Sequence, residues 1–153
     1  MIDEFRGRYY FLSNLYPCTI EYQGIKYPTV EHFYVAMKVN DQQLINGIYY
    51  TPNDFREMIS TIKIPEEVKK IGGKVKLRKN WSTKKLEIMN WVIREKFKDE
   101  KLAEMLLSTG DEKLVESNYW KDFYWGVCNG KGENHLGKIL MEVREELKLN
   151  IFQ

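Results

Sequence analysis

The chain contains 153 residues, of which 43% are apolar and 30% charged, and its formal net charge is +2. This composition is typical of a soluble globular protein and excludes a disordered or membrane-embedded chain, while the low net charge does not indicate a dedicated nucleic-acid binder. The length suffices for a real hydrophobic core, so we expect residues 1–153 to form a single domain.

The sequence contains no sign of export, membrane insertion or metal binding. Met1-Ile2-Asp3-Glu4 is acidic and no apolar segment follows it, and no apolar run approaches the roughly 20 residues that span a bilayer. Cys18 and Cys128 form no metal-spaced cluster, and His32 and His135 are isolated. We therefore expect a cytoplasmic protein with free thiols, no metal, no cofactor and no membrane partner. The oligomeric state stays open.

The first third of the chain predicts short β elements and one helix. Turn residues separate short runs of β-branched and aromatic residues, and a threonine precedes an apolar run that it can cap. The expected elements are a strand at 9–11, a loop at 12–14, a hairpin formed by 18–22 and 25–27, and a helix from residue 30 to about 39 with Thr29 as its N-cap.

The remainder predicts mainly helices, although residues 41–51 give no clear assignment. Proline or a capping residue precedes most of the apolar-periodic segments. Helices are expected at 52–62, 65–72, 82–98 with Ser82 as cap, and 100–107 with Asp99 as cap. A turn at 109–111 and a brief strand at 113–116 follow. The last helix is expected to start at Asn134, and its predicted inner residues are Leu136, Ile139, Leu140, Val143 and Leu147. We predict a mainly α fold with small β elements, of the α+β class.

The helix expected after Thr29 is apolar almost all the way round, yet it carries Glu31 and Lys38. Seven positions are nearly two helical turns, about 10 Å, so both side chains leave the same face. Charged groups above a buried surface need a partner or a chemical role. A structural ion pair or a lysine that extends its ammonium to the surface is the alternative, although the spacing is long for a direct salt bridge.

Three other segments carry groups that can bind a ligand. Asp122-Phe123-Tyr124-Trp125-Gly126 places a carboxylate beside a ring that can stack. Glycines in 132–137 precede a helix N-terminus, where a phosphate can approach backbone amides, but their spacing matches neither a Walker nor a Rossmann fingerprint. Arg6, Ser13 and Asn14 supply donors for phosphate or ribose hydroxyls, or else belong to a solvated arm and a turn.

The aromatic content of 14% leaves two interpretations open. The aromatic rings either fill a tyrosine-rich core or line a pocket that stacks flat rings.

Taken together, these residues resemble the YbiA-like or NADAR family. That pattern runs from an aromatic-Leu-Ser-Asn segment through a Pro-Thr/Ser-Val-Glu-His helix ending in Lys to a late Trp-Gly and a Gly-x-Asn-x-Leu-Gly. The matching pieces follow one another along almost the whole chain: 11–14, 27–32 with Lys38, Trp81 before a helix with Met89, Lys96 and Phe97, 107–111, 114–116, 122–126, and 132–137 with Leu140, Met141 and Arg144. Cys128 replaces a frequent second glycine and residues 40–62 differ from the usual middle segment, departures that concern substrate choice more than chemistry.

The resemblance implies a mostly helical fold and an N-glycosidase, a hydrolase that cleaves the bond between ribose C1 and a nitrogen. The implied substrates are small phosphoribosyl or ADP-ribosyl compounds, including intermediates of riboflavin biosynthesis and ADP-ribosylated guanine. The expected catalytic residues are Glu31, Lys38 and Asp122. The expected substrate-binding residues are Arg6, Ser13, Asn14, Trp81, Trp125, Gly126 and Asn134.

These residues suit the chemistry because cleavage of the C1–N bond builds positive charge on the ribose ring. A carboxylate beside C1 stabilises that charge or activates water, and a lysine whose pKa is lowered by burial can form a Schiff base. The alternative is a non-catalytic module that binds ADP-ribose or a nucleotide. A third interpretation is a nucleic-acid-binding protein whose pocket accepts a flipped modified base, although the low net charge disfavours strong duplex affinity.

Overall fold

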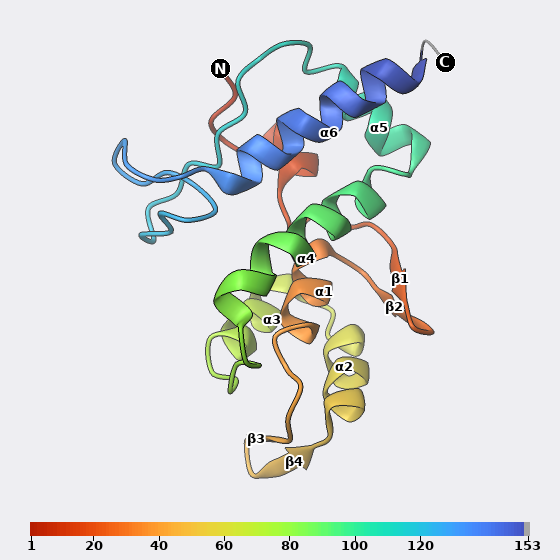
Figure 1. The fold of residues 1–153 in the computed structure, drawn as a ribbon, viewed down its shortest axis with the longest axis vertical. Coiled ribbons are helices and arrows are strands. Elements are labelled where there is room, and N and C mark those ends of the chain that lie inside the picture. The colour runs from red at the N-terminus through yellow and green to blue at the C-terminus, as the bar shows by residue number, and fades with distance from the viewer. Residues whose placement is uncertain (152–153) are drawn as a thin grey trace. The chain divides into compact units, whose positions relative to one another are not determined.

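The computed structural model describes residues 1–151, which form a mainly helical chain with two small antiparallel hairpins (Figure 1). This confirms the predicted fold class. The chain divides into two compact units, which we call the middle unit, Pro17–Val92, and the terminal unit, Met1–Tyr16 together with the chain from Ile93 onward. Helix α4 (Trp81–Lys96) contributes residues to both. Among the described residues, no helix has the length and apolar character needed to cross a membrane.

The first hairpin of the middle unit is the predicted one. Strands β1 (Ile20–Tyr22) and β2 (Ile25–Tyr27) are antiparallel, with Ile20 opposite Tyr27. Gln23 and Gly24 both have positive φ, 48° and 81°, as a two-residue turn of the primed type requires.

A second hairpin occupies the segment that the sequence left unassigned. Strands β3 (Gln43–Ile45) and β4 (Ile48–Tyr50) are joined by Asn46 and Gly47, whose φ values are 50° and 78°. An Asn-Gly pair is a strong local signal for such a turn, but the flanking residues show no regular apolar alternation.

Three helices lie entirely within this unit: α1 (Val30–Ala36), α2 (Pro52–Thr61) and α3 (Pro65–Gly72). Helix α1 packs against both α2 and α3 (Figure 1), and its side chains Val30, Val35 and Ala36 are fully buried. The helices expected at 52–62 and 65–72 are therefore confirmed, since proline at the first helical position fixes both starts.

Helix α1 is shorter than predicted. Thr29 is its N-cap, as expected, because its hydroxyl accepts a hydrogen bond from the His32 amide at 3.1 Å. The helix ends at Ala36 rather than near Val39. Directly after it, the Lys38 amide donates to the Val35 carbonyl at 3.1 Å and closes a tighter turn.

His32 joins α1 to the end of α2. Its Nε2 lies 2.7 Å from the Ile62 carbonyl oxygen and its Nδ1 lies 2.7 Å from the Thr29 hydroxyl. Because a carbonyl only accepts, Nε2 carries the proton and Nδ1 accepts from the Thr29 hydroxyl. Both ring nitrogens of this buried imidazole are thus satisfied in the neutral form.

The terminal unit contains the 3₁₀ helix η1 (Gly7–Leu12) and the helices α5 (Glu100–Leu107) and α6 (His135–Ile151). Helix α5 packs against η1 and α6. Asp99 caps α5 as predicted, since its side chain accepts from the Leu102 amide at 3.0 Å.

Three local predictions in the remaining segments were wrong. The strand expected at 9–11 is part of η1, where the neighbouring side chains Phe11 and Leu12 are both buried, unlike the alternating burial of a strand. Ser82 is not a cap, because α4 already begins at Trp81. The strand expected at 113–116 is reduced to a single bridge between Leu114 and Ile2.

The last helix begins as predicted, directly after Asn134, which has a left-handed φ of 52°. Its predicted inner residues Leu136, Ile139, Leu140 and Val143 are buried, and Leu147 is partly buried.

Candidate active site

The expected site residues fall in both units. Glu31, Lys38 and Trp81 lie in the middle unit. The terminal unit holds the others: Arg6, Ser13, Asn14, Asp122, Trp125, Gly126 and Asn134.

Lys38 lies just beyond the end of α1 and turns its amine toward α3. Its Nζ donates to the Gly72 carbonyl oxygen at 3.1 Å and lies 5.4 Å from the centre of the Tyr34 ring. Burial lowers the pKa of Lys38 below its ordinary value of 10.5. The Glu31 charge opposes this effect and the Lys85 charge adds to it. The sequence-based expectation of a lysine with a lowered pKa therefore agrees with the environment of this side chain.

Glu31 occupies the first turn of α1 and is partly buried. The positive end of the helix dipole favours the ionised carboxylate at this position. Its charge raises the pKa of Lys38, against the larger effect of burial.

Tyr34 extends this cluster to Trp81. Their ring centres lie 5.1 Å apart at an interplanar angle of 56°, and only 8% of Trp81 is exposed. Amine, phenol and indole thus form a continuous set of contacts around the end of α1.

Three neighbours of Lys38 were not predicted from the sequence: Tyr34, Gly72 and Lys85. Tyr34 could have been found, since it lies three residues after Glu31 and four before Lys38 on the same helical face. Gly72 and Lys85 come from α3 and α4, and no local pattern places them beside α1.

In the terminal unit, Asp122 organises its own loop. Its Oδ1 accepts hydrogen bonds from the amides of Tyr124 at 3.1 Å and Trp125 at 2.9 Å. The Asn118 side chain accepts from the Asp122 amide and donates to the Asp122 carbonyl. One carboxylate oxygen is therefore committed to the turn that carries Trp125.

Gly126 and Trp125 follow in the same turn. A Cβ at Gly126 would collide with the carbonyl and carboxylate oxygens of Glu116, so this position requires glycine. The partly buried Trp125 ring meets Tyr124 edge to face, with ring centres 4.8 Å apart.

The Asn134 amide is used within the protein. Its Nδ2 donates to the Leu114 carbonyl at 2.9 Å and its Oδ1 accepts from the Glu116 amide at 3.0 Å. This buried side chain fixes the segment 114–116 beside the start of α6. A direct contact between Asn134 and substrate stays a prediction.

The predicted phosphate donors near the N-terminus differ in exposure. Arg6 is exposed and lies 3.9 Å from the Glu4 carboxylate, a weak surface pair. Ser13 follows η1, and its hydroxyl accepts from the Leu15 amide at 3.1 Å. The Ser13 carbonyl accepts a hydrogen bond at 2.9 Å from the amine of Lys96, a residue that is only 1% exposed. This bond fixes the turn that contains Asn14.

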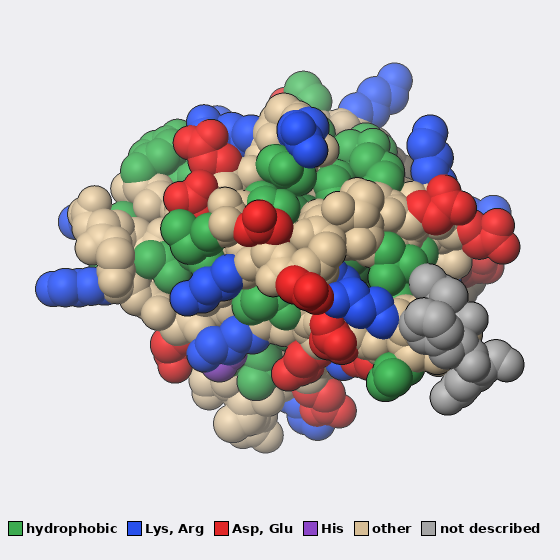
Figure 2. Space-filling view, turned by 90° about the horizontal axis from the view of Figure 1, so that it is seen from above, with side chains coloured by type: hydrophobic (Ala, Val, Ile, Leu, Met, Phe, Trp, Pro, Cys, Tyr) green, Lys and Arg blue, Asp and Glu red, His purple; other side chains and the backbone are tan. Residues whose placement is uncertain are grey.

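Each unit also contains a cavity. One of about 380 Å³ lies in the middle unit and one of about 550 Å³ in the terminal unit. Of the expected site residues, only Asn134 lines either of them. Within residues 1–151, no three His, Cys, Asp or Glu side chains are grouped to hold a metal ion. On the face shown in Figure 2, basic and acidic side chains are interspersed.

Comparison with known proteins places the chain in a family. Residues 3–148 match the NADAR domain. The chain is 36% identical over 141 residues to the N-glycosidase YbiA of Escherichia coli, covering 90% of this chain and 81% of that protein. It is 36% identical over 148 residues to a riboflavin biosynthesis protein of Vibrio vulnificus, covering 95% of this chain but only 37% of that protein.

The fold agrees with a solved member. The NMR structure of E. coli YbiA superimposes with a TM-score of 0.78 at 33% identity, covering all of this chain and 90% of that one. The expectation of an enzyme that hydrolyses N-glycosyl bonds is confirmed at the level of the family. The chain belongs to the NADAR domain family.

Proposed function

We propose that this protein is an N-glycosidase that hydrolyses the bond between ribose C1 and a base or amine nitrogen in a phosphoribosyl or ADP-ribosyl substrate. The observation that carries the proposal is the partly buried amine of Lys38, which donates to the Gly72 carbonyl at 3.1 Å and whose pKa is lowered by burial. The names of the relatives, N-glycosidase and riboflavin biosynthesis protein, support the same class of reaction.

In this proposal, Glu31 acts on the ribose carbon. Departure of the nitrogen builds positive charge on C1 and the ring oxygen, and a nearby carboxylate stabilises that charge. The same carboxylate can remove a proton from the attacking water, whose hydroxyl bonds to C1, and pass that proton to the departing nitrogen.

Lys38 offers a covalent route to the same products. Opening of the sugar ring breaks the C1–O bond and leaves C1 doubly bonded to the substrate nitrogen. The neutral amine adds to C1, the substrate nitrogen departs as the protonated amine, and a C1–Nζ imine forms. Water then hydrolyses this imine and releases the open sugar and free lysine. Burial of Lys38 supports this route because only the neutral amine is nucleophilic.

The other expected site residues are assigned to substrate binding. We assign to Asp122 the orientation of a ribose hydroxyl through the carboxylate oxygen that the turn does not use. We assign to Trp125, and likewise to Trp81, stacking on the base or the ribose. Arg6, Ser13 and Asn14 would bind phosphate or hydroxyl groups. Gly126 would allow the turn to approach Glu116, and Asn134 would hold the Glu116 amide in place.

The test is release of the base or amine from three substrates: a phosphoribosylamino-pyrimidine, a free ADP-ribosyl compound and an oligonucleotide with ADP-ribosylated guanine. We expect the protein to act on at least one, and Glu31→Gln and Lys38→Met to abolish turnover while Lys74→Met, at an exposed position, has no effect. Tight binding of ADP-ribose with no release from any substrate would instead identify a binding module.

Borohydride added during turnover separates the two routes. An adduct on Lys38, found by mass spectrometry and absent from Lys38→Met, supports the imine. Turnover without an adduct assigns the step to direct attack by water.

A further inference from the structure

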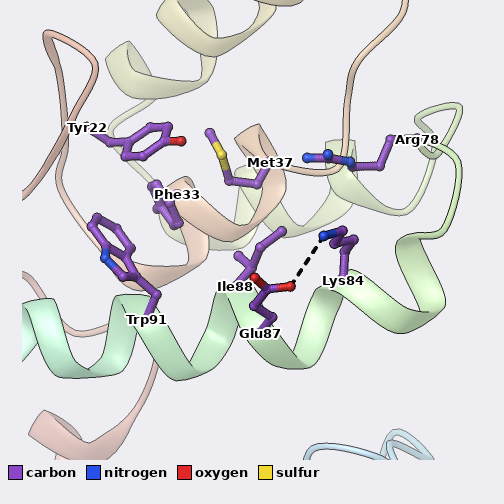
Figure 3. Close-up of a pocket in the computed structure, with 8 residues that line it drawn as sticks. All are labelled: Tyr22, Phe33, Met37, Arg78, Lys84, Glu87, Ile88 and Trp91. Atoms are coloured by element: carbon purple, nitrogen blue, oxygen red, sulfur yellow. Dashed lines mark hydrogen bonds and ion pairs between the residues drawn. The ribbon is translucent and has the colours of Figure 1, made fainter.

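The cavity in the middle unit lies on a different side of α1 from the candidate catalytic pair. Phe33 lines it from α1, whereas Tyr34 and Glu31 lie about 100° and 160° away around the same helix. Helix α4 supplies the opposite wall with Ile88 and Trp91 (Figure 3). Its volume of about 380 Å³ is within the range of small-molecule sites.

One end of the cavity is aromatic. The rings of Tyr22, Phe33 and Trp91 contact one another, with centres 5.3–5.5 Å apart. Phe33 is 2% exposed, but Trp91 is 39% exposed. A large indole that stays this accessible beside a cavity offers a face on which a flat ring can stack.

The other end is cationic. Arg78 and Lys84 line it together with Glu87, whose carboxylate lies 3.4 Å from the Lys84 amine. Lys84 is thereby neutralised, and one net positive charge remains. Figure 3 shows the Arg78 side chain extending toward Met37 at this end.

The lack of hydrogen-bond partners for the Arg78 side chain among the described residues is the strongest indication that this cavity binds a ligand. Arg78 makes no side-chain hydrogen bond or ion pair within residues 1–151, and its Nε is buried without a partner. Its backbone amide is fixed by a 2.7 Å hydrogen bond to the Lys38 carbonyl. A planar guanidinium held in this way matches the paired oxygens of a phosphate, and a buried donor left unsatisfied carries a free-energy cost that such a ligand removes.

The two ends are separated by the length of a mononucleotide. Lys84 and Trp91 are seven residues apart on α4, about 10 Å along the helix axis. We propose that this cavity is a second ligand site that binds a nucleoside monophosphate, with the base stacked on Trp91 and the phosphate on Arg78. This site is separate from the proposed N-glycosidase reaction and does not depend on it.

The test is calorimetric titration of the full chain with adenosine 5′-monophosphate, adenosine and inorganic phosphate. We expect the monophosphate to bind. Adenosine lacks the phosphate and inorganic phosphate lacks the base, so each should bind at least about tenfold more weakly. Arg78→Gln and Trp91→Ala should each weaken binding of the monophosphate by about tenfold or more. Lys79→Gln, at the exposed neighbouring position, is the matched control and should bind normally.

Arg78→Gln keeps the test valid if Trp91→Ala fails to fold, because the Arg78 side chain makes no hydrogen bond within the described residues. Glu31→Gln should bind the monophosphate as the unmodified protein does, which separates this cavity from the candidate active site. No binding, binding unaffected by Arg78→Gln, or binding lost in Glu31→Gln would each overturn the proposal, whatever the outcome of the base-release assay.

Discussion

Lys38 donates a hydrogen bond at 3.1 Å to the carbonyl oxygen of Gly72, the last residue of α3. This contact between the end of one helix and the end of another fixes the direction of the amine. Because a helix C-terminus carries partial negative charge, it attracts a cation there, whereas burial favours the neutral amine. The net result is a lowered pKa for Lys38, with burial as the dominant cause.

Gly72→Ala should therefore displace the amine. A Cβ at this position would lie 2.7 Å from a Val35 methyl group and 3.3 Å from the Lys38 Nζ. We expect overpacking to lower the free energy of unfolding by about 1–3 kcal/mol and the displaced amine to reduce turnover by up to about 100-fold. Denaturant unfolding and the base-release assay measure the two effects.

Gly73→Ala is the matched control for this change. A Cβ at Gly73 would meet only backbone carbonyls, the nearer being that of Lys70 at 3.5 Å, which is ordinary contact. Turnover should stay within about twofold of the unmodified protein. Equal losses of turnover in the Gly72 and Gly73 variants would contradict a role of Gly72 in placing Lys38.

Lys38→Met should change how stability depends on pH. The pKa of Lys38 is below 10.5 in the folded chain, so in this range the unfolded chain binds more protons than the folded chain. The free energy of unfolding of the unmodified protein should then rise, relative to Lys38→Met, as pH increases from the folded-state pKa to about 10.5. Urea unfolding of both proteins at matched pH values tests this, and a constant difference would count against it.

Local chemistry accounts for the parts of the fold that the sequence predicted. Thr29 and Asp99 cap their helices, and Gln23-Gly24 forms its turn, because each depends on neighbouring backbone groups only. The strand expected at 9–11 was wrong because its aromatic residues favour a strand only where a partner strand exists. Asn46-Gly47 carried a clear turn signal, but the flanking residues lacked the alternation that defines strands.

The site shows the same division. Helical spacing predicted that Glu31 and Lys38 share one face, and the Glu31 charge does affect the pKa of Lys38. The Gly72 carbonyl and the charge of Lys85 reach Lys38 only through the packing of other helices. The depth of burial, and hence the direction of the pKa shift, depends on tertiary structure that periodicity does not contain.

His32 should make the protein less stable in mild acid. Burial lowers its pKa below 6.5, while the hydrogen bond to the Ile62 carbonyl acts in the opposite direction. Its stabilising contribution is therefore complete above about pH 6.5 and is lost as pH falls toward and through the folded-state pKa. His32→Gln should lack this part of the pH dependence. Urea unfolding of both proteins between about pH 5 and pH 8 tests this prediction. If the free energy of unfolding falls equally with decreasing pH in both proteins, His32 does not have this role.

Asn134→Ala separates a structural role from a substrate contact. The change removes hydrogen bonds to the Leu114 carbonyl and the Glu116 amide and puts alanine at a φ of 52°. We expect the free energy of unfolding to fall by about 1–3 kcal/mol beyond the backbone cost, because two buried backbone groups lose their partner. Asn129→Ala measures that backbone cost alone, since Asn129 has a φ of 53° and is exposed. Equal losses of stability, with a raised KM only in Asn134→Ala, would instead show that the amide contacts substrate.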